Sequence, residues 1–425
     1  MKILIIGGGG REDALAWKIS QSPLADRIYC MPGNGGIGQI AECVPGDPGK
    51  VAEVAEWAEK QGIGLTVVGP ELPLTQGIVD EFSRRGMDIF GPNRAAAQIE
   101  GSKVFMKQLL KKYGIPTADF RIFDDPGQAK TYISGSGSSC VVKADGLAAG
   151  KGVYVCQDTA EANEAVTDIM ERRIFGEAGD HVIVEECLVG EEASFLAFTD
   201  GQTVIPMIAS QDHKRIYDGD RGPNTGGMGA YSPAGLVTPE MAQHIIAEIM
   251  QPTVRAMAQE GCPYKGVLYA GLMICHGKPY VLEFNARFGD PETQSILPLL
   301  ETDLVEVMQA VIHKRLSQVQ LEWRKGAAVC IVLASGGYPG DYQKGKLISG
   351  LDQAQGLKDV LVFHAGTVRK DGNYLTSGGR VLGVVGRGDD LPKAISAAYA
   401  GAGQICFEDM HYRRDIGQKG LKYGN

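Results

Sequence analysis

The sequence predicts an α/β and α+β multidomain protein: an N-terminal doubly wound parallel sheet, a larger α+β segment and a small C-terminal β-rich domain. Over the first hundred residues, an apolar strand, a glycine-containing loop and a helix recur. From about residue 103, short strands with hairpin-like loops replace these crossovers. From about residue 326, short β-like runs accompany one helix near 391–400. The expected domains are therefore 1–102, 103–325 and 326–425.

The N-terminal domain is predicted from strands that each run into a loop. The first strand, at 2–6, precedes four glycines and a helix whose apolar residues Ala14, Leu15 and Ile19 share a face. Further strands are expected at 27–31, 65–68 and 89–90. In such a sheet, ligands bind at the loops that follow the carboxyl ends of the strands.

The two later segments are predicted from shorter strands. A lysine-rich helix is expected at 103–113, and a glycine-rich loop separates two strands at 139–143 and 152–156. The other strands of the middle segment are expected at 181–185, 193–198, 203–209, 266–274 and 279–284. Those of the final segment are expected at 327–333, 360–364 and 380–385.

Composition excludes several classes of protein. The 425 residues carry a net charge of −9, whereas a nucleic-acid surface needs a basic face, so the basic ending at 413–422 is interpreted as a solvated tail. No apolar stretch approaches the ~20 residues of a membrane span, and the run at 2–6 is too short for a signal peptide. The nine cysteines include no C-x-x-C pair. We therefore expect a cytoplasmic protein with free thiols and with no nucleic-acid or membrane partner.

The glycine loops do not match the common nucleotide fingerprints. In the first loop, Glu12 stands where a dinucleotide-binding G-x-G-x-x-G needs its third glycine. A phosphate at the amino terminus of that helix remains open. The loop at 146–152 is one residue short of a P-loop and lies in a hairpin. Because Lys143 and Lys151 flank it, a flap over phosphates is the better interpretation.

A strand that ends in two oxygen-bearing side chains indicates a metal site. With a period of two, Glu283 and Asn285 lie on one face of the strand, and Val281 shares that face nearer the core. Magnesium prefers oxygen ligands and usually shares them with phosphates. The pattern therefore suits a magnesium ion bound to ATP, although a solvated edge strand remains an alternative.

At this point the sequence resembles the glycinamide ribonucleotide synthetase family of the ATP-grasp superfamily. The likeness runs through almost the whole chain. Its most specific part is RFGDPE at 287–292, whereas the lysine flap is shared more widely among ATP-grasp ligases. The other stretches that carry the likeness are 7–15, 67–74, 143–153, DHKR at 212–215 and GPNTGGMGAY at 222–231.

The resemblance implies an ATP-grasp fold, with a flexible lid subdomain at about 120–190. ATP would lie between two lobes, with Lys103 and Lys143 near its phosphates. The hinge that contains Glu185 and Leu188 would offer backbone groups to adenine, and Glu192 would accept hydrogen bonds from the ribose.

The resemblance also implies binding of the other substrates. Gly9, Gly10, Asp212, Lys214 and Arg287 would bind glycine or 5-phosphoribosylamine. His213, in the same charged loop, is expected to bind glycine or phosphate rather than to transfer a proton, with a solvated loop as the alternative.

Charge neutralisation during catalysis would fall to Lys143, to Arg287 and to Mg²⁺ or Mn²⁺ on Glu283 and Asn285. Asp290 would position the glycine ammonium or Arg287.

The sequence departs from the family pattern at two places. Asp13 stands where the family usually has histidine, and we expect this carboxylate to face outward in the first turn of its helix. Many ATP-grasp relatives have an acidic metal ligand on the preceding strand, but residues 266–272 contain none. The second ligand would then come from elsewhere or be water.

The reaction implied by the resemblance joins glycine to 5-phosphoribosylamine, with ATP converted to ADP and phosphate by way of a glycyl phosphate. An alternative is another ATP-grasp carboxylate–amine ligase or a carboxylating enzyme. A non-catalytic nucleotide-binding protein is a third interpretation, against which Lys143, Glu283, Asn285 and Arg287 argue. A monomer or small homo-oligomer is expected.

Overall fold

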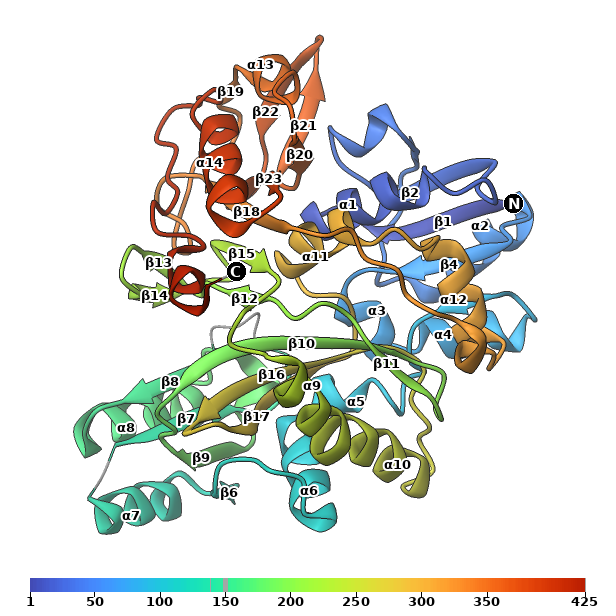
Figure 1. The fold of residues 1–425 in the computed structure, drawn as a ribbon. Coiled ribbons are helices and arrows are strands. Elements are labelled where there is room, and N and C mark those ends of the chain that lie inside the picture. Colours follow the sequence, from blue (N-terminus) through green and yellow to red (C-terminus); the bar gives the residue numbers. More distant parts are fainter. Residues whose placement is uncertain (138, 148–151, 425) are drawn as a thin grey trace.

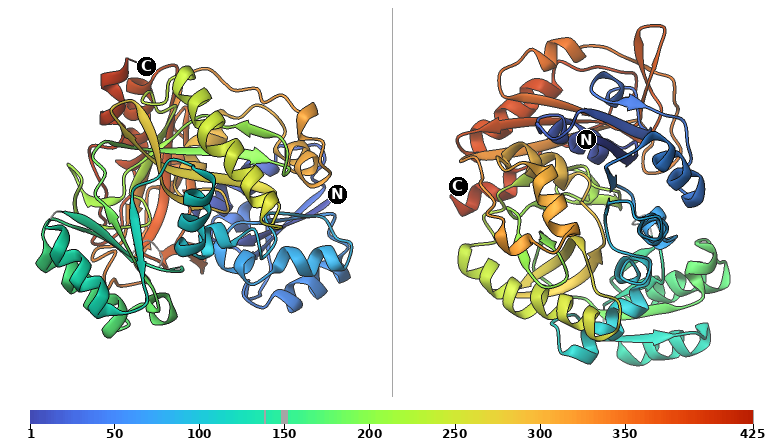
Figure 2. Two further views of the ribbon diagram at one scale, coloured as in Figure 1. Left: turned by 90° about the horizontal axis from the view of Figure 1, so that it is seen from below. Right: turned by 90° about the vertical axis from the view of Figure 1, so that its right-hand side faces the viewer.

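The computed structural model describes residues 1–137, 139–147 and 152–424, which fold around four principal sheets (Figures 1 and 2). The first sheet has the order β3-β2-β1-β4-β5, and all its strands are parallel, which confirms the predicted doubly wound domain. Its strands are β1 (Lys2–Gly7), β2 (Arg27–Pro32), β3 (Glu42–Cys43), β4 (Leu65–Val68) and β5 (Ile89–Phe90).

Helices cover both faces of this sheet because its central strand is apolar on both sides. Ile3 and Ile5 of β1 pack into one core cluster, and Leu4 and Ile6 pack into another, as the period of a strand requires. The segment's helices are α1 (Gly10–Ile19), η1 (Ile37–Gln39), α2 (Val51–Gln61), α3 (Glu71–Thr75), α4 (Ile78–Arg84) and α5 (Gln98–Gly101).

The second sheet, of order β6-β9-β7-β8, is antiparallel and has a core of its own. Its hairpin β7–β8 is the one predicted, but the tip at 148–151, including Lys151, lies outside the described residues, so the predicted flap stays untested. This part comprises α6 (Lys103–Tyr113), β6 (Phe120–Phe123), α7 (Pro126–Ser136), β7 (Cys140–Ala144), β8 (Val153–Cys156), α8 (Thr159–Val166), η2 (Thr167–Glu171), η3 (Gly176–Gly179) and β9 (Val182–Glu186).

The third sheet, of order β11-β10-β16-β17, is also antiparallel and crosses the middle of the molecule (Figure 1). Residues of α6 and α10 share the largest core cluster with this sheet. The elements are β10 (Glu191–Thr199), β11 (Val204–Pro206), α9 (Pro239–Ile245), η4 (Ile246–Met250), α10 (Gln251–Gln259), β16 (Gly266–Cys275) and β17 (Lys278–Asn285).

The fourth sheet, of order β12-β15-β18-β23-β20, combines distant segments of the chain. Its strands are β12 (Gln211–Asp212), β15 (Gly229–Ser232), β18 (Ala327–Ala334), β20 (Val360–His364) and β23 (Arg380–Gly388), with α14 (Leu391–Ala402) packed against it. β12 and β15 precede residue 325 in the chain, so hydrogen bonding between strands continues across the proposed boundary between the second and third domains.

Short elements connect these sheets. A hairpin formed by β13 and β14 and a small sheet of order β19-β22-β21 were not predicted. The remaining elements are β13 (Arg215–Tyr217), β14 (Arg221–Asn224), α11 (Glu292–Ile296), η5 (Leu297–Leu299), α12 (Leu304–Ile312), η6 (Leu316–Gln318), β19 (Leu347–Ile348), α13 (Leu351–Gln355), β21 (Thr367–Lys370), β22 (Asn373–Thr376) and η7 (Gln418–Tyr423). Within the described residues, no helix has the length and apolarity that crossing a membrane requires.

Asp13 does not face outward, contrary to expectation. Its side chain is buried, and its Oδ2 accepts a hydrogen bond from the backbone N–H of His364 at 2.5 Å. The cause is the packing of β20 against α1, which covers the first turn of the helix (Figure 1). Burial is the main cause that raises the pKa of Asp13 to about 7.

The basic ending at 413–422 is not a solvated tail, contrary to the interpretation from the sequence. Arg413 is fully buried and pairs with Asp415 at 2.6 Å and with Asp220 at 3.0 Å. Lys422 pairs with Glu191 at the start of β10. A buried guanidinium needs such partners, and they anchor the end of the chain to the β13–β14 hairpin and the third sheet.

We predict that Arg413→Ala lowers the free energy of unfolding by about 3 kcal/mol, because it removes the buried cation of this cluster. Arg414→Ala is the matched control, since that neighbouring side chain is exposed, and it should change stability by less than about 0.5 kcal/mol. Urea unfolding followed by circular dichroism measures both. Equal losses in the two variants would contradict the structural role of Arg413.

We predict that Asp13→Asn stabilises the fold increasingly as the pH rises from 4 to 7. An acid whose pKa rises from 3.8 to about 7 on folding is protonated in the folded state while the unfolded state has already ionised. The folded state is therefore penalised by up to about 4 kcal/mol above pH 7, at about 1.4 kcal/mol per pH unit, and asparagine removes this penalty. Urea unfolding between pH 4 and 8 tests this, with the exposed Asp26→Asn as control. A constant difference between Asp13→Asn and the unsubstituted chain would refute it.

Candidate functional site

Three buried charges meet where the second sheet approaches the third. The Lys143 ammonium of β7 lies 2.9 Å from Oε2 of Glu185 in β9, and the Lys107 ammonium of α6 lies 3.0 Å from the same oxygen. Lys143 also donates to the carbonyl of Leu282 at 3.1 Å. A register shift between β16 and β17 at this point leaves Leu282 without a partner in the ladder, so its carbonyl is available to the lysine.

Glu185 therefore differs from its predicted use as a backbone hinge residue. Its backbone lies between β6 and β7 inside the sheet, and its side chain binds two lysines. Leu188, in contrast, lies in the connection from β9 to β10, outside any strand. Of the two predicted hinge residues, only Leu188 therefore has an irregular backbone.

Lys103 begins α6 and reaches the same region. Its ammonium donates to the carbonyl of Gly146 at 3.0 Å, at the base of the β7–β8 hairpin. Ser102, which caps α6, donates to Asp145 of the hairpin. Burial lowers the pKa of Lys103. The structure therefore brings Lys103 to the base of the hairpin, and its expected contact with ATP phosphates stays a prediction.

Glu283, one of the two predicted metal ligands, lies beside a further lysine. The Lys214 ammonium is 3.1 Å from Glu192 and 3.4 Å from Glu283. The positive charge of Lys214 is the main cause that lowers the pKa of Glu283 to about 2, with contributions from Lys103 and Lys143. Glu283 is thus an ionised carboxylate that faces three cations.

Asn285 has the exposure that the predicted strand face requires. Glu283 and Asn285 are partly exposed, and Phe284 between them is buried. Among the described residues, no cluster of three or more histidine, cysteine or acidic side chains is placed to hold a metal. The protein thus offers two oxygen ligands here, which suits a cation that also takes phosphate oxygens and water.

Arg287 is held by two carboxylates from other parts of the chain. Its guanidinium lies 3.2 Å from Glu71 of α3 and 2.9 Å from Glu100 of α5. Glu100 also accepts the backbone N–H of Ala286 at 2.6 Å. These contacts fix the guanidinium between the N-terminal domain and the end of β17.

Asp290 pairs with Arg380 of β23 at 3.1 Å instead of with Arg287, and Gln294 also donates to it. Burial opposes ionisation, but the nearby guanidinium of Arg380 keeps the pKa of Asp290 below its usual value. Arg380 donates further to the carbonyls of Asp290 and Gly226. A residue of the C-terminal segment thus completes the site.

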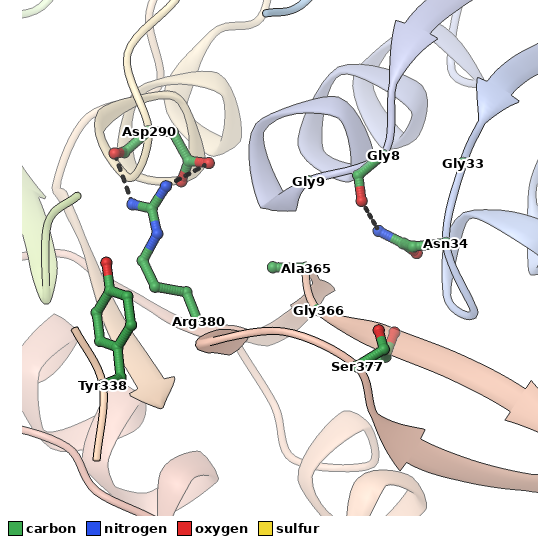
Figure 3. Close-up of a pocket in the computed structure, with 11 residues that line it drawn as sticks. Gly8, Gly9, Gly33, Asn34, Asp290, Tyr338, Ala365, Gly366, Ser377 and Arg380 are labelled. Atoms are coloured by element: carbon green, nitrogen blue, oxygen red, sulfur yellow. Dashed lines mark hydrogen bonds and ion pairs between the residues drawn. The ribbon is translucent and has the colours of Figure 1, made fainter. Parts of the chain in front are cut away.

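An open cavity of ≈ 360 Å³ lies beside this ion pair (Figure 3). It separates the first loop of the N-terminal domain from the turn before β21 and from β23. Polar groups line most of it. The lining residues are Gly8, Gly9, Gly33, Asn34, Asp290, Tyr338, Ala365, Gly366, Thr367, Ser377 and Arg380.

The first glycine loop approaches other backbone too closely for side chains. A Cβ on Gly8 would lie 2.3 Å from the carbonyl oxygen of Gly33. Gly9 lines the cavity, but its N–H already donates to the carboxylate of Glu12 at 2.6 Å, so the chain itself supplies an anion to that N–H. Gly10 is buried against Gln294 and does not line the cavity.

His213 and Asp212 face different surroundings. His213 is 1% exposed; its Nδ1 contacts the carbonyl oxygen of Gly229, and burial lowers its pKa to about 4. The charges that act on it are those of the C-terminal segment around Arg413, whereas Lys214 and Arg380 act on Asp212. The structure therefore brings Asp212 to the charged site and does not bring His213 there.

Several residues of the site escaped the sequence prediction. Lys107 follows Lys103 by four residues on one helical face, and this spacing was a usable signal. Glu71 follows a predicted strand end, which was another. Arg380 had no local signal, because only the tertiary fold brings β23 to Asp290.

Comparison with known proteins identifies the family. Three profiles of phosphoribosylglycinamide synthetase match the chain: the N domain at 1–100, the ATP-grasp (A) domain at 101–293 and the C domain at 328–419. The phosphoribosylamine–glycine ligase of Caldanaerobacter subterraneus is 50% identical over 98% of this chain and 99% of its own length. The enzyme of the same name from Pseudomonas aeruginosa is 51% identical over 99% and 98%.

Solved structures agree with this assignment. The crystal structure of the phosphoribosylamine–glycine ligase of Thermotoga maritima has a TM-score of 0.85 at 34% identity and covers 98% of this chain and 100% of its own. The biotin carboxylase domain of the Hydrogenobacter thermophilus 2-oxoglutarate carboxylase has a TM-score of 0.75 at 15% identity over 97% and 91%, which is a likeness of fold alone. The chain belongs to the phosphoribosylglycinamide synthetase family and has its ATP-grasp fold.

Proposed function

We propose that this protein is an ATP-dependent phosphoribosylamine–glycine ligase, which makes glycinamide ribonucleotide for purine biosynthesis. The observation that carries the proposal is the pairing of two charged regions: the lysine-rich cluster around Glu283, and the polar cavity beside Asp290 and Arg380. One suits nucleotide phosphates and the other a sugar phosphate. Relatives of that name at about half identity over the full length support the same activity.

On the nucleotide side, Lys103, Lys143 and Lys214 would neutralise the phosphates. The ammonium of Lys143 is now paired with Glu185, and a phosphate would compete for the same charge. Leu188 would offer backbone groups to adenine, and Glu192 would accept from the ribose hydroxyls.

The residues at the end of β17 fit a divalent cation. Glu283 is ionised and Asn285 adds an amide oxygen, while ATP phosphates and water would complete the ligand set. When bound, Mg²⁺ or Mn²⁺ would neutralise charge on the terminal phosphates of ATP.

On the acceptor side, the open cavity would take 5-phosphoribosylamine. The backbone of Gly8, the hydroxyls of Tyr338 and Ser377 and the guanidinium of Arg380 offer hydrogen-bonding groups to the sugar phosphate, whereas the backbone N–H of Gly9 is already bound by Glu12. Asp290, which is paired with Arg380, would hold the glycine ammonium between the two regions.

The chemistry follows from the poor leaving ability of a carboxylate oxygen. The glycine carboxylate attacks the γ-phosphorus of ATP, the bond to the bridging oxygen breaks, and ADP leaves. The sugar amine then attacks the carbonyl carbon of glycyl phosphate and phosphate departs. The protein aligns the reactants and neutralises charge in both steps.

A carboxylating enzyme that uses bicarbonate is the second candidate, and the biotin carboxylase fold is its support. That likeness stands at 15% identity, whereas the ligase relatives stand at about half, so we favour the ligase. We further propose a monomer or small homo-oligomer in the cytoplasm, where nine free cysteines would remain reduced.

We predict that Glu283→Gln lowers kcat by at least about 100-fold, because an ionised metal ligand is lost. Glu260→Gln is the control: its carboxylate also pairs with a lysine and is similarly exposed, 30% against 34%, but Glu260 follows the end of α10 and belongs to none of the contacts of the site. Melting temperatures without nucleotide should fall by similar, small amounts in both variants. ADP release measured with glycine and freshly made phosphoribosylamine gives kcat, and equal activity of the two variants would refute the metal assignment.

We predict that glycine labelled with ¹⁸O in its carboxylate passes one labelled oxygen to the released phosphate, because acyl transfer breaks the bond between the glycine carbonyl carbon and that oxygen. Mass spectrometry of the phosphate measures this. Activation as an adenylate would instead place the label in AMP. Label in AMP, or unlabelled phosphate, contradicts the glycyl phosphate.

A further inference from the structure

Asp212 differs from the other carboxylates of the site in its hydrogen bonding. Within the residues that the structure describes, Glu283 and Glu192 bind Lys214, and Asp290 binds Arg380. Glu292 accepts from the hydroxyls of Tyr269 and Ser194. Asp212 Oδ1 accepts one hydrogen bond, from the backbone N–H of His213 at 2.6 Å. Among the described residues, no group donates a hydrogen bond to Asp212 Oδ2. A carboxylate oxygen therefore remains available.

The position of Asp212 is fixed by its surroundings. It ends β12, and the backbone of Gly227 lies so close that an added Cβ would be 2.8 Å from Asp212 Oδ1 and 2.4 Å from Pro291 Cδ. Gly227 has φ +108°, which favours glycine. The carboxylate is thus held between the 225–228 loop and the start of α11.

Asp212 also lies between the two charged regions. The positive charges of Lys214, on the nucleotide side, and of Arg380, on the cavity side, both act on it. The other titratable groups that face it are Tyr269 of β16, Glu292 of α11 and Cys330 of β18.

We propose that Asp212 is the base that takes the proton of the attacking amine. This role rests on the proposed function. The amine nitrogen forms a bond to the glycyl carbonyl carbon, the bond from that carbon to the phosphate oxygen breaks, and the phosphate leaves with the electron pair. The proton leaves the nitrogen for Asp212 Oδ2 and passes to the departing phosphate, which becomes HPO₄²⁻. Asp212 ends the cycle ionised.

The electrostatics support this role. Burial, and then the charge of Glu292, raise the pKa of Asp212 above its ordinary value, whereas Lys214 and Arg380 act in the opposite direction. A carboxylate with a raised pKa is a stronger base than an exposed one, and a positioned base of this kind contributes roughly 10²- to 10⁴-fold to a rate.

The experiment separates the two chemical steps. Exchange of ¹⁸O between the bridging and non-bridging positions of β,γ-labelled ATP, with glycine and without the amine, reports glycyl phosphate formation. Single-turnover formation of glycinamide ribonucleotide reports amide formation. For Asp212→Asn we expect exchange within about twofold of the unsubstituted chain and ligation slowed at least about 100-fold. Asp389→Asn, an exposed residue of the C-terminal domain, is the control and should change neither rate.

The other outcomes contradict the proposal. A parallel loss of exchange and ligation in Asp212→Asn would assign the residue to glycine binding, and unchanged ligation would remove it from the reaction. No glycine-dependent exchange in the unsubstituted chain would instead refute the acyl phosphate of the proposed function. Asp212→Glu keeps a carboxylate and should shift the acidic limb of the pH profile for ligation. An unshifted limb would overturn the assignment even if Asp212→Asn failed to fold.

Discussion

The site depends on the matching of buried charges. A cation withdrawn from water must be paired or hydrogen-bonded, and each pair here joins separate parts of the chain. Arg287 at the end of β17 pairs with acids of the N-terminal domain, and Arg380 of the C-terminal sheet pairs with Asp290. The N-terminal, middle and C-terminal parts of the chain are thus held together by the side chains of the candidate site. Phosphates that enter such a site exchange one anionic partner of a lysine for another, which costs less than exposing a bare charge.

The same constraint explains the glycines near the cavity. The first loop lies against the backbone of Gly33, and the 225–228 loop lies against Asp212 and the start of α11, so no Cβ fits at Gly8 or Gly227. Glu12 contributes by occupying the N–H of Gly9 with its carboxylate. The N–H of Gly9 therefore binds the carboxylate of Glu12 and stabilises the loop, instead of binding a phosphate. Other groups of the cavity are left for the sugar phosphate.

Sequence reasoning succeeded where local pattern decides structure. The parallel sheet followed from strand and loop repeats, and the alternation at 283–285 followed from the period of a strand. It failed where tertiary contact decides. Asp13 is polar and stands in a first helical turn, so exposure was expected, but β20 covers it. Arg413 belongs to a basic run that looks solvated, yet the tertiary fold buries its guanidinium, which pairs with Asp415 nearby in the chain and with the distant Asp220.

The alternation of a strand also explains why Asp212 and His213 have different surroundings. Adjacent side chains of β12 and the residue after it point to opposite faces, so one carries the open carboxylate toward Lys214 and Arg380, and the other packs its imidazole toward Tyr231 and the C-terminal segment. Burial lowers the pKa of the His213 imidazole to about 4, so the ring is neutral at physiological pH. Its Nδ1 contacts the carbonyl oxygen of Gly229. His213 therefore packs in the interior beside Tyr231 and stabilises the end of the strand. Asp212, on the opposite face, is the residue that we propose exchanges a proton with the substrate.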